Sequence, residues 1–86
     1  MLRIVPGETD GGGTVLRLEG QLIGPWVDEL RRACEALLTR GAVTLDLAEV
    51  SFVEQRGVEL LHALARGGVP LRHCSPFVTE QLKVRV

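Results

Sequence analysis

The sequence has few aromatic residues, few cysteines and no long apolar run. One Trp, two Phe and no Tyr make up 3% of the 86 residues, so aliphatic side chains must fill any core. No apolar run approaches the roughly 18 residues of a membrane-spanning helix, and we expect no membrane insertion. The two cysteines, Cys34 and Cys74, form no CxxC pair and stand near no cluster of histidines. We therefore expect reduced thiols, no bound metal and no cofactor.

The charged residues give no excess of one sign. The 10 basic and 11 acidic residues leave a net charge of -1. Binding to nucleic acid or to an anionic membrane surface usually needs clustered positive charge, so we expect no nucleic-acid partner. The N-terminal segment is too short, and too soon interrupted by Pro6 and Gly7, for a signal peptide, and we expect a cytoplasmic protein. A chain of this length builds one core, so residues 1–86 are predicted to form a single domain.

Side chains suited to catalysis are present but poorly grouped. Asp46, Glu49 and Glu54 are expected near one end of the third predicted strand, and Glu59 and His62 lie three residues apart on a predicted helix. A catalytic carboxylate pair needs an enclosing cleft, and a small sheet covered by helices leaves little volume for one. We interpret the carboxylates as solvated loop charge and His62 as part of the wet side of its helix. The protein is predicted not to be an enzyme.

Alternation, helical spacing and turn residues predict the order strand, strand, helix, strand, helix, strand, helix. The predicted strands are residues 2–5, 14–20, 43–47 with a short continuation at 50–53, and 69–73, with a hairpin loop at 6–13. The predicted helices are residues 25–40, a segment after the turn 54–57 that stops at Gly67, and 77–83 behind a Ser75-Pro76 N-cap. Strands that alternate with helices favour parallel pairing through right-handed crossovers, and the first hairpin adds one antiparallel strand. The predicted fold class is α/β, with a four-stranded, mixed and mostly parallel sheet and about three helices.

Residues 25–40 carry the most complete set of helix signals. Pro25 suits the first helical position, Asp28 lies where the helix dipole favours negative charge, and Gly41 ends the run. An apolar stripe follows the helical period, so this face is predicted to pack on the sheet. The stripe consists of Val27, Leu30, Cys34 and Leu37, broadened by Trp26, Ala33 and Leu38.

The segment from Val43 to Leu64 joins a buried strand, a turn and an amphipathic helix around one polar corner. Its pattern is an acidic residue followed by alternating apolar residues, a second acidic residue and a glycine: Asp46, Leu47, Val50, Phe52, Glu54 and Gly57. This pattern resembles the central motif of STAS domains, a module shared by bacterial anti-sigma factor antagonists, sulfate transporter tails and some lipid transport accessories. The resemblance implies the STAS fold over most of the chain.

The sequence departs from that motif at the position of the regulatory phosphorylation site. In the regulatory members a partner kinase phosphorylates a Ser or Thr directly after the acidic residue, whereas this chain has Gln55 followed by Arg56. A Gln amide is neutral and cannot be esterified, so the surface is predicted not to gain the roughly two negative charges of a phosphate. The resemblance therefore implies a regulatory protein-protein interaction module without the phosphorylation switch.

The corner and its surroundings are the predicted partner-binding surface. We assign to it five residues of the motif region and, by resemblance alone, two more from the preceding loop region: Glu54, Gln55, Arg56, Gly57 and Glu59, with Gln21 and Trp26. Trp26 has a second interpretation, in which it seals the end of the core. Arg56 also has one, a surface ion pair with Glu54 or Glu59 that contributes about 0 to 1 kcal/mol.

Two classes of partner fit the resemblance. The first is a kinase-like anti-sigma protein, bound as by an anti-sigma factor antagonist, with the Arg56 guanidinium pairing with a carboxylate of the partner. The second is the ATPase of an ABC-type lipid transporter, to which this chain would be an accessory subunit. A regulatory scaffold is a third alternative, and the sequence leaves a homodimer open.

Overall fold

The computed structural model describes residues 1–8, 11 and 13–84, and it confirms the predicted order of elements. The strands are β1 (Leu2–Glu8), β2 (Thr14–Leu22), β3 (Val43–Val53) and β4 (Leu71–Arg72). The helices are α1 (Pro25–Leu38), α2 (Gln55–Arg66) and α3 (Pro76–Val84). In this described part of the chain no helix is long and apolar enough to cross a membrane.

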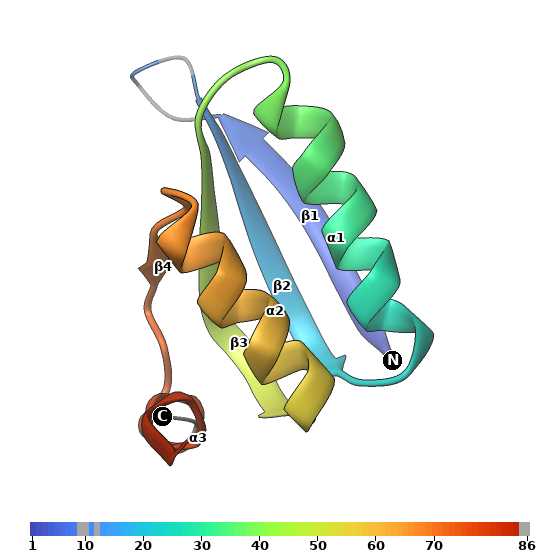
Figure 1. Ribbon diagram of the computed structural model, residues 1–86, viewed down its shortest axis with the longest axis vertical. Helices are drawn as coiled ribbons and strands as arrows, with labels where there is room; N and C mark the ends of the chain where they lie inside the picture. The colour runs from blue at the N-terminus through green and yellow to red at the C-terminus, as the bar shows by residue number, and fades with distance from the viewer. Residues whose placement is uncertain (9–10, 12, 85–86) are drawn as a thin grey trace.

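The strands form one mixed sheet in the order β1-β2-β3-β4. β1 runs antiparallel to β2, whereas β2, β3 and β4 pair in parallel, as predicted. Because β2 and β3 are parallel, their carboxyl ends lie at the same edge of the sheet, and α1 and α2 both begin there (Figure 1). Loops that follow parallel strands at such an edge bring together residues far apart in sequence.

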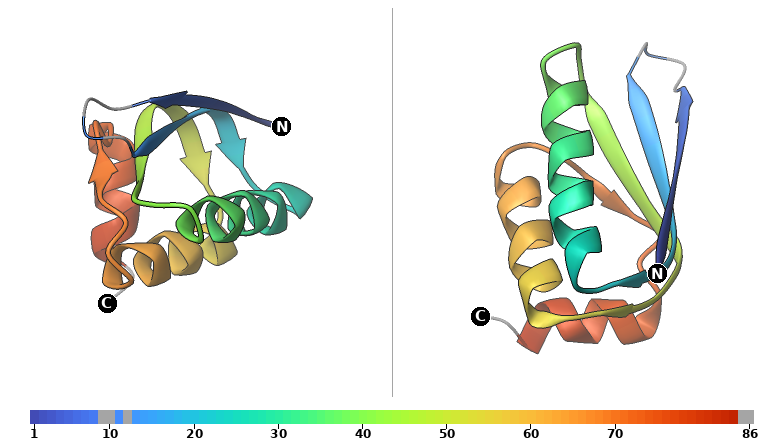
Figure 2. Two further views of the ribbon diagram at one scale, coloured as in Figure 1. Left: turned by 90° about the horizontal axis from the view of Figure 1, so that it is seen from above. Right: turned by 90° about the vertical axis from the view of Figure 1, so that its right-hand side faces the viewer.

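Two helices form the second layer of the molecule. α1 and α2 lie side by side over one face of the sheet, and α3 lies crosswise near the start of α2, where it also contacts β3 (Figure 2). Alternate residues of the central strands point toward the helices, as the period of a strand requires. The largest fully buried side chains are aliphatic and include Leu16, Leu18, Leu22, Leu30, Leu45, Leu47 and Leu61.

The apolar stripe of α1 packs on the sheet as predicted. Val27, Leu30 and Cys34 are buried, and the partly buried residues of the stripe, Trp26, Ala33 and Leu37, pack against the same core. The prediction is wrong for Leu38, which is 42% exposed because it lies at the border of the stripe in the last turn. Burial raises the pKa of the Cys34 thiol to about 11, so this free cysteine stays protonated and poorly nucleophilic.

β1 is longer than predicted and continues through Pro6 and Gly7 to Glu8. The sequence placed these residues in the hairpin loop, since Pro and Gly are typical of turns. β1 is an edge strand, where a residue without an N–H is tolerated because one side of the strand forms no ladder. Residues 9, 10 and 12 of the predicted loop lie outside the described residues.

β4 is shorter than predicted and forms the other edge of the sheet. Pro70 precedes it, and the Pro70 carbonyl accepts a hydrogen bond from the backbone N of Leu45 at 2.9 Å. α3 begins at Pro76, and the Oγ of Ser75 accepts a hydrogen bond from the backbone N of Val78 at 3.2 Å. The predicted Ser-Pro N-cap is therefore confirmed.

Candidate interaction surface at the start of α2

The polar corner lies where β3 ends and α2 begins. Only Glu54 separates the two elements, and its extended backbone (φ -76°, ψ 172°) makes it the N-cap residue of α2. The sequence predicted a turn over residues 54–57, but Gln55, Arg56 and Gly57 form the first turn of the helix. Their side chains therefore leave the corner in directions that helical geometry fixes.

Glu54 links the beginnings of two helices. Its carboxylate accepts a hydrogen bond from the backbone N of Gly24, the N-cap residue of α1, 30 residues earlier. Its own backbone N donates to the carbonyl of Leu22 at 3.1 Å. A carboxylate at two helix N-termini also faces the positive ends of both dipoles. The interpretation of Glu54 as solvated loop charge is therefore wrong, because parallel pairing of β2 and β3 brings Gly24 to it.

The other carboxylates expected near this end of β3 lie elsewhere. Asp46 is in the middle of β3, where it accepts a hydrogen bond from the backbone N of Ala48 at 3.0 Å and lies 3.2 Å from Nδ1 of His73. The hydrogen bond from Ala48 is the main reason that the pKa of Asp46 lies below its ordinary value, and His73 adds to it. Glu49 is exposed. The predicted cluster of three carboxylates thus does not form, and no group of three potential metal ligands occurs among the described residues.

Gly57 is buried in the first turn of α2, where it lies close to the ends of β2 and β3. A Cβ atom at this position would lie 2.8 Å from Cγ1 of Val53 and 3.0 Å from Cδ2 of Leu22, well inside ordinary contact. The glycine therefore sets the approach of α2 to the ends of β2 and β3. Gly57 was assigned to the partner-binding surface, but its burial gives it a packing role beneath that surface.

Gln55 lies in the first turn of α2, and its side chain is exposed. Its Nε2 lies 3.4 Å from Oε2 of Glu59, one helical turn along. This spacing is the i, i+4 geometry in which a Gln and a carboxylate stabilise a helix modestly. An accessible neutral amide therefore stands at the outer surface of the corner.

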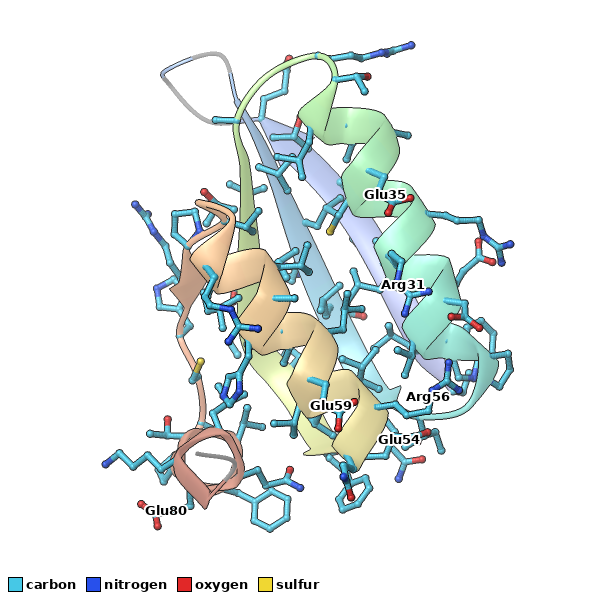
Figure 3. The ribbon with its side chains drawn as sticks, in the orientation of Figure 1. Arg31, Glu35, Glu54, Arg56, Glu59 and Glu80 are labelled. Carbon is cyan, nitrogen blue, oxygen red and sulfur yellow. The ribbon has the colours of Figure 1, made fainter. Side chains whose placement is uncertain are left out.

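Arg56 forms an ion pair with a carboxylate of α1. Its guanidinium lies 3.3 Å from Oδ1 of Asp28, and the same oxygen accepts a hydrogen bond from Arg31 at 2.8 Å (Figure 3). Desolvation raises the pKa of Asp28, but the hydrogen bonds and charges of Arg31 and Arg56 outweigh it, so this pKa lies below its ordinary value. The alternative interpretation, a surface ion pair with Glu54 or Glu59, did not include Asp28, because this contact joins residues 28 positions apart in the sequence.

The sequence matches a family model over most of its length. Residues 7–84 match the family described as "Mlab, STAS domain". The chain belongs to the STAS domain family. A comparison with curated protein sequences gives no match.

Solved structures with the same fold include regulatory STAS domains. The unphosphorylated form of the anti-sigma factor antagonist SpoIIAA superimposes with a TM-score of 0.72 at 20% identity, covering 94% of this chain and 82% of SpoIIAA. The STAS domain of an antisigma-factor antagonist from Rhodobacter sphaeroides gives a TM-score of 0.59 at 20% identity, covering 88% of this chain and 94% of that one. An uncharacterised Shewanella loihica protein with a SpoIIAA-like fold gives 0.60 at 11% identity, covering 96% and 75%. The likeness to these structures establishes the fold.

The two residues assigned to the surface of this STAS domain by resemblance alone differ in exposure. Gln21 is exposed near the end of β2, where it pairs with Phe52 of β3. Trp26 is partly buried and packs against the core from the first turn of α1. This contact favours the interpretation in which Trp26 seals the end of the core.

α3 of this STAS domain is held in place by hydrogen bonds to two neighbouring elements, α2 and β3. His62 was expected on the wet side of α2, but it is partly buried, and its Nε2 lies 3.0 Å from the carbonyl of Leu82 in α3. Gln81 forms two hydrogen bonds with the backbone of Val53 at the end of β3, accepting from its N at 3.1 Å and donating to its carbonyl at 2.7 Å. These contacts fix α3 against the start of α2.

A surface groove lies beside the corner, and sequence reasoning did not identify it. Phe52 and Phe77 are 39% and 53% exposed, and their ring centroids are 6.3 Å apart. They belong to a groove of about 440 Å³, which we call the aromatic groove; it is lined by Phe52, Val53, Glu54, Gln55, Val58, Phe77, Glu80 and Gln81. The pairing of β2 with β3 shifts register between Gly20 and Gln21, so Val53 rather than Phe52 points into the core. No sequence signal marks this irregularity.

Proposed function

We propose that this STAS domain is a non-catalytic protein-protein interaction module that resembles an anti-sigma factor antagonist but lacks the phosphorylation switch. The single observation that carries the proposal is the exposed amide of Gln55 in the first turn of α2. The resemblance to the STAS motif aligns this residue with the phosphorylated hydroxyl of the regulatory members. STAS domains with the SpoIIAA fold generally act as regulatory modules rather than as enzymes, which supports the same view.

The charge at this position explains why the substitution matters. A phosphate at the first turn of α2 would add about 1.5 to 2 negative charges to the surface that a partner meets. Gln55 carries no charge at any pH, and its amide nitrogen does not accept a phosphoryl group. On this proposal the surface keeps one charge state and its binding is constitutive.

Arg56 is the proposed contact with a charged group of the partner. Its side chain is 54% exposed, and Asp28, its partner in this chain, is shared with Arg31. A partner carboxylate can therefore take the Arg56 guanidinium while Asp28 keeps its shorter bond to Arg31. Such an exchange leaves neither Asp28 nor Arg56 unpaired, so breaking the Arg56–Asp28 ion pair costs little free energy on binding.

A second candidate function is that of an accessory subunit of an ABC-type lipid transporter. The observation that favours it is the exposure of Phe52 and Phe77 beside the corner. Permanent complexes have more apolar interfaces than transient ones, and an interface without a phosphorylation switch suits a permanent subunit. On this view the same surface would contact the transporter ATPase.

Capture of the native partner tests both candidates. The tagged domain is incubated with the cytoplasmic and membrane fractions of its native host, beside Arg56→Ala and the control Arg66→Ala, which removes an exposed Arg from the far end of α2. We expect a kinase-like anti-sigma protein with the wild type and with Arg66→Ala, and a roughly tenfold lower yield with Arg56→Ala. Recovery of a transporter ATPase with the same dependence on Arg56 would support the second candidate instead. Equal recovery of any partner with all three proteins would contradict the assigned surface.

A further inference from the structure

We propose that the aromatic groove binds an amphipathic, positively charged helix of a protein partner. The proposal rests on the proposed function, because Glu54 and Gln55 belong to both the groove and the corner. It adds a second subsite to the surface and states the chemistry of the segment that occupies it.

The groove is apolar where a partner side chain would enter. Phe52 and Phe77 form its open sides, while Val53 and Val58 are buried beneath them. The chain has only three aromatic residues, and two of them are exposed together here, away from the core. Exposed aromatic residues grouped in a concave site are typical of surfaces that another molecule covers.

The walls of the groove are held rigidly before any partner arrives. The paired hydrogen bonds between Gln81 and the backbone of Val53, at 3.1 and 2.7 Å, join α3 to the end of β3. The contact of His62 with the Leu82 carbonyl at 3.0 Å joins α3 to α2. A groove that is already formed loses little conformational entropy on binding, which favours its use as a binding site.

The charges around the groove select a positive partner. Glu54 and Glu80 both line it. Among the described residues of α3, Lys83 is the cation beside this rim, 3.9 Å from Glu80 in a pair that is 71% exposed at both ends, whereas Arg56 is directed to Asp28 on α1 (Figure 3). The two carboxylates of the lining against one ammonium group leave the described rim of the groove negative, which attracts Lys or Arg side chains and repels phosphate and carboxylate head groups. Charge complementarity thus favours a cationic peptide over a fatty acid or an anionic lipid.

The backbone around the groove favours a helical occupant over an extended one. A strand would bind by hydrogen bonds to an open sheet edge, but Gln81 already occupies the N–H and the carbonyl of Val53. A helix requires only an apolar channel for side chains at i, i+3, i+4 and i+7, which the groove between β3, α2 and α3 supplies.

A nuclear magnetic resonance titration of the ¹⁵N-labelled full chain tests the proposal. One probe is a short helical peptide with Leu at i, i+3, i+4 and i+7 and Lys at the flanking positions, and the matched probe has Glu in place of Lys. We expect the Lys peptide to shift the amide signals of Val53, Val58 and Phe77 saturably, and the Glu peptide to bind at least about tenfold more weakly. Phe77→Ser should weaken binding of the Lys peptide about tenfold, and Leu38→Ser, which alters a similarly exposed apolar residue on α1, should leave it unchanged.

Each other result contradicts the groove proposal. Absence of a shift with the Lys peptide, equal binding of both peptides, or equal loss with Phe77→Ser and Leu38→Ser would overturn it. Shifts of the same amides by palmitate or by phosphatidylglycerol vesicles, without shifts by the Lys peptide, would assign the groove to lipid instead.

Partner capture separates this proposal from the proposed function. Loss of the partner with Arg56→Ala but full recovery with Phe77→Ser would leave the proposed function standing and overturn the groove. Binding of the Lys peptide to the groove, together with partner recovery that does not depend on Arg56, would support the groove and overturn the proposed function.

Discussion

Replacing Gly57 by Ala tests how closely α2 must approach the sheet. The added Cβ would lie 2.8 Å from Cγ1 of Val53 and 3.0 Å from Cγ and Cδ2 of Leu22, where ordinary contacts begin at 3.4 Å. Both neighbours are buried, and Val is stiff at χ1, so α2 must shift outward. Overpacking of this kind costs about 1–3 kcal/mol, whereas the better helix propensity of Ala returns at most about 1 kcal/mol. We therefore expect the free energy of unfolding to fall by about 1 kcal/mol, or roughly 4–8 °C in Tm.

Urea denaturation of a double-mutant cycle measures this cost. Val53→Ala removes the Cγ1 atom that the new Cβ would approach, so Gly57→Ala should cost less in that background than in the wild type. Gly67→Ala is the control, because a Cβ there makes only ordinary contacts of 3.5 Å, and it should leave stability nearly unchanged. Stabilisation by Gly57→Ala, or an equal cost in both backgrounds, would refute the close approach of α2.

Four further predictions concern the same region and the sheet beside it. Glu54→Ala removes the acceptor for the Gly24 N–H and should lower the free energy of unfolding by about 1–3 kcal/mol in urea denaturation, and Glu54→Gln, which keeps an acceptor, should lose less; equal loss would contradict the link. Gln81→Ala should speed hydrogen exchange at the Val53 amide, and unchanged exchange would count against the hydrogen bonds that hold α3. The pKa of Asp46 is lower in the folded chain than its ordinary value of 3.8. The contribution of this carboxylate to the free energy of unfolding is therefore present above pH 3.8 and is lost as the pH falls through the folded pKa. The decline in the urea midpoint below about pH 4 should accordingly be smaller in Asp46→Asn than in the wild type. Gln55→Ser should accept phosphate from a captured kinase-like partner in an intact-mass assay while the wild type does not, and modification of the wild type would contradict the lost switch.

Much of the fold could be predicted from local signals. Pro25 and Gly41 mark the ends of the first helical segment, Ser75-Pro76 marks the beginning of the last, and alternation over Val43–Leu47 marks the central strand. These signals act within a few residues, so one sequence is enough to read them. The predicted ends of the strands were less accurate. β1 continues through Pro6 and Gly7, because one side of an edge strand needs no hydrogen bonds to a neighbouring strand.

The place of the polar corner in the fold was predictable, but the contacts of its side chains were not. The motif located the corner at Glu54 to Arg56, which the structure places at the start of α2. The contacts made there depend on the meeting of distant segments: Glu54 with Gly24, and Arg56 with Asp28. The exposure of Phe52 depends on a register shift between β2 and β3 that alternation along one strand cannot reveal.

The measurement that tests the central claim most directly is partner capture by Gln55→Glu, quantified against the wild type and Gln55→Ala. Gln55 is exposed in the first turn of α2, so a carboxylate there leaves the fold intact and is favoured by the helix dipole. If a neutral surface at this position is what the partner binds, Gln55→Glu should reduce recovery about tenfold and Gln55→Ala should stay within about twofold of the wild type. Full recovery with Gln55→Glu would contradict the claim that an uncharged residue at this position keeps the surface competent to bind.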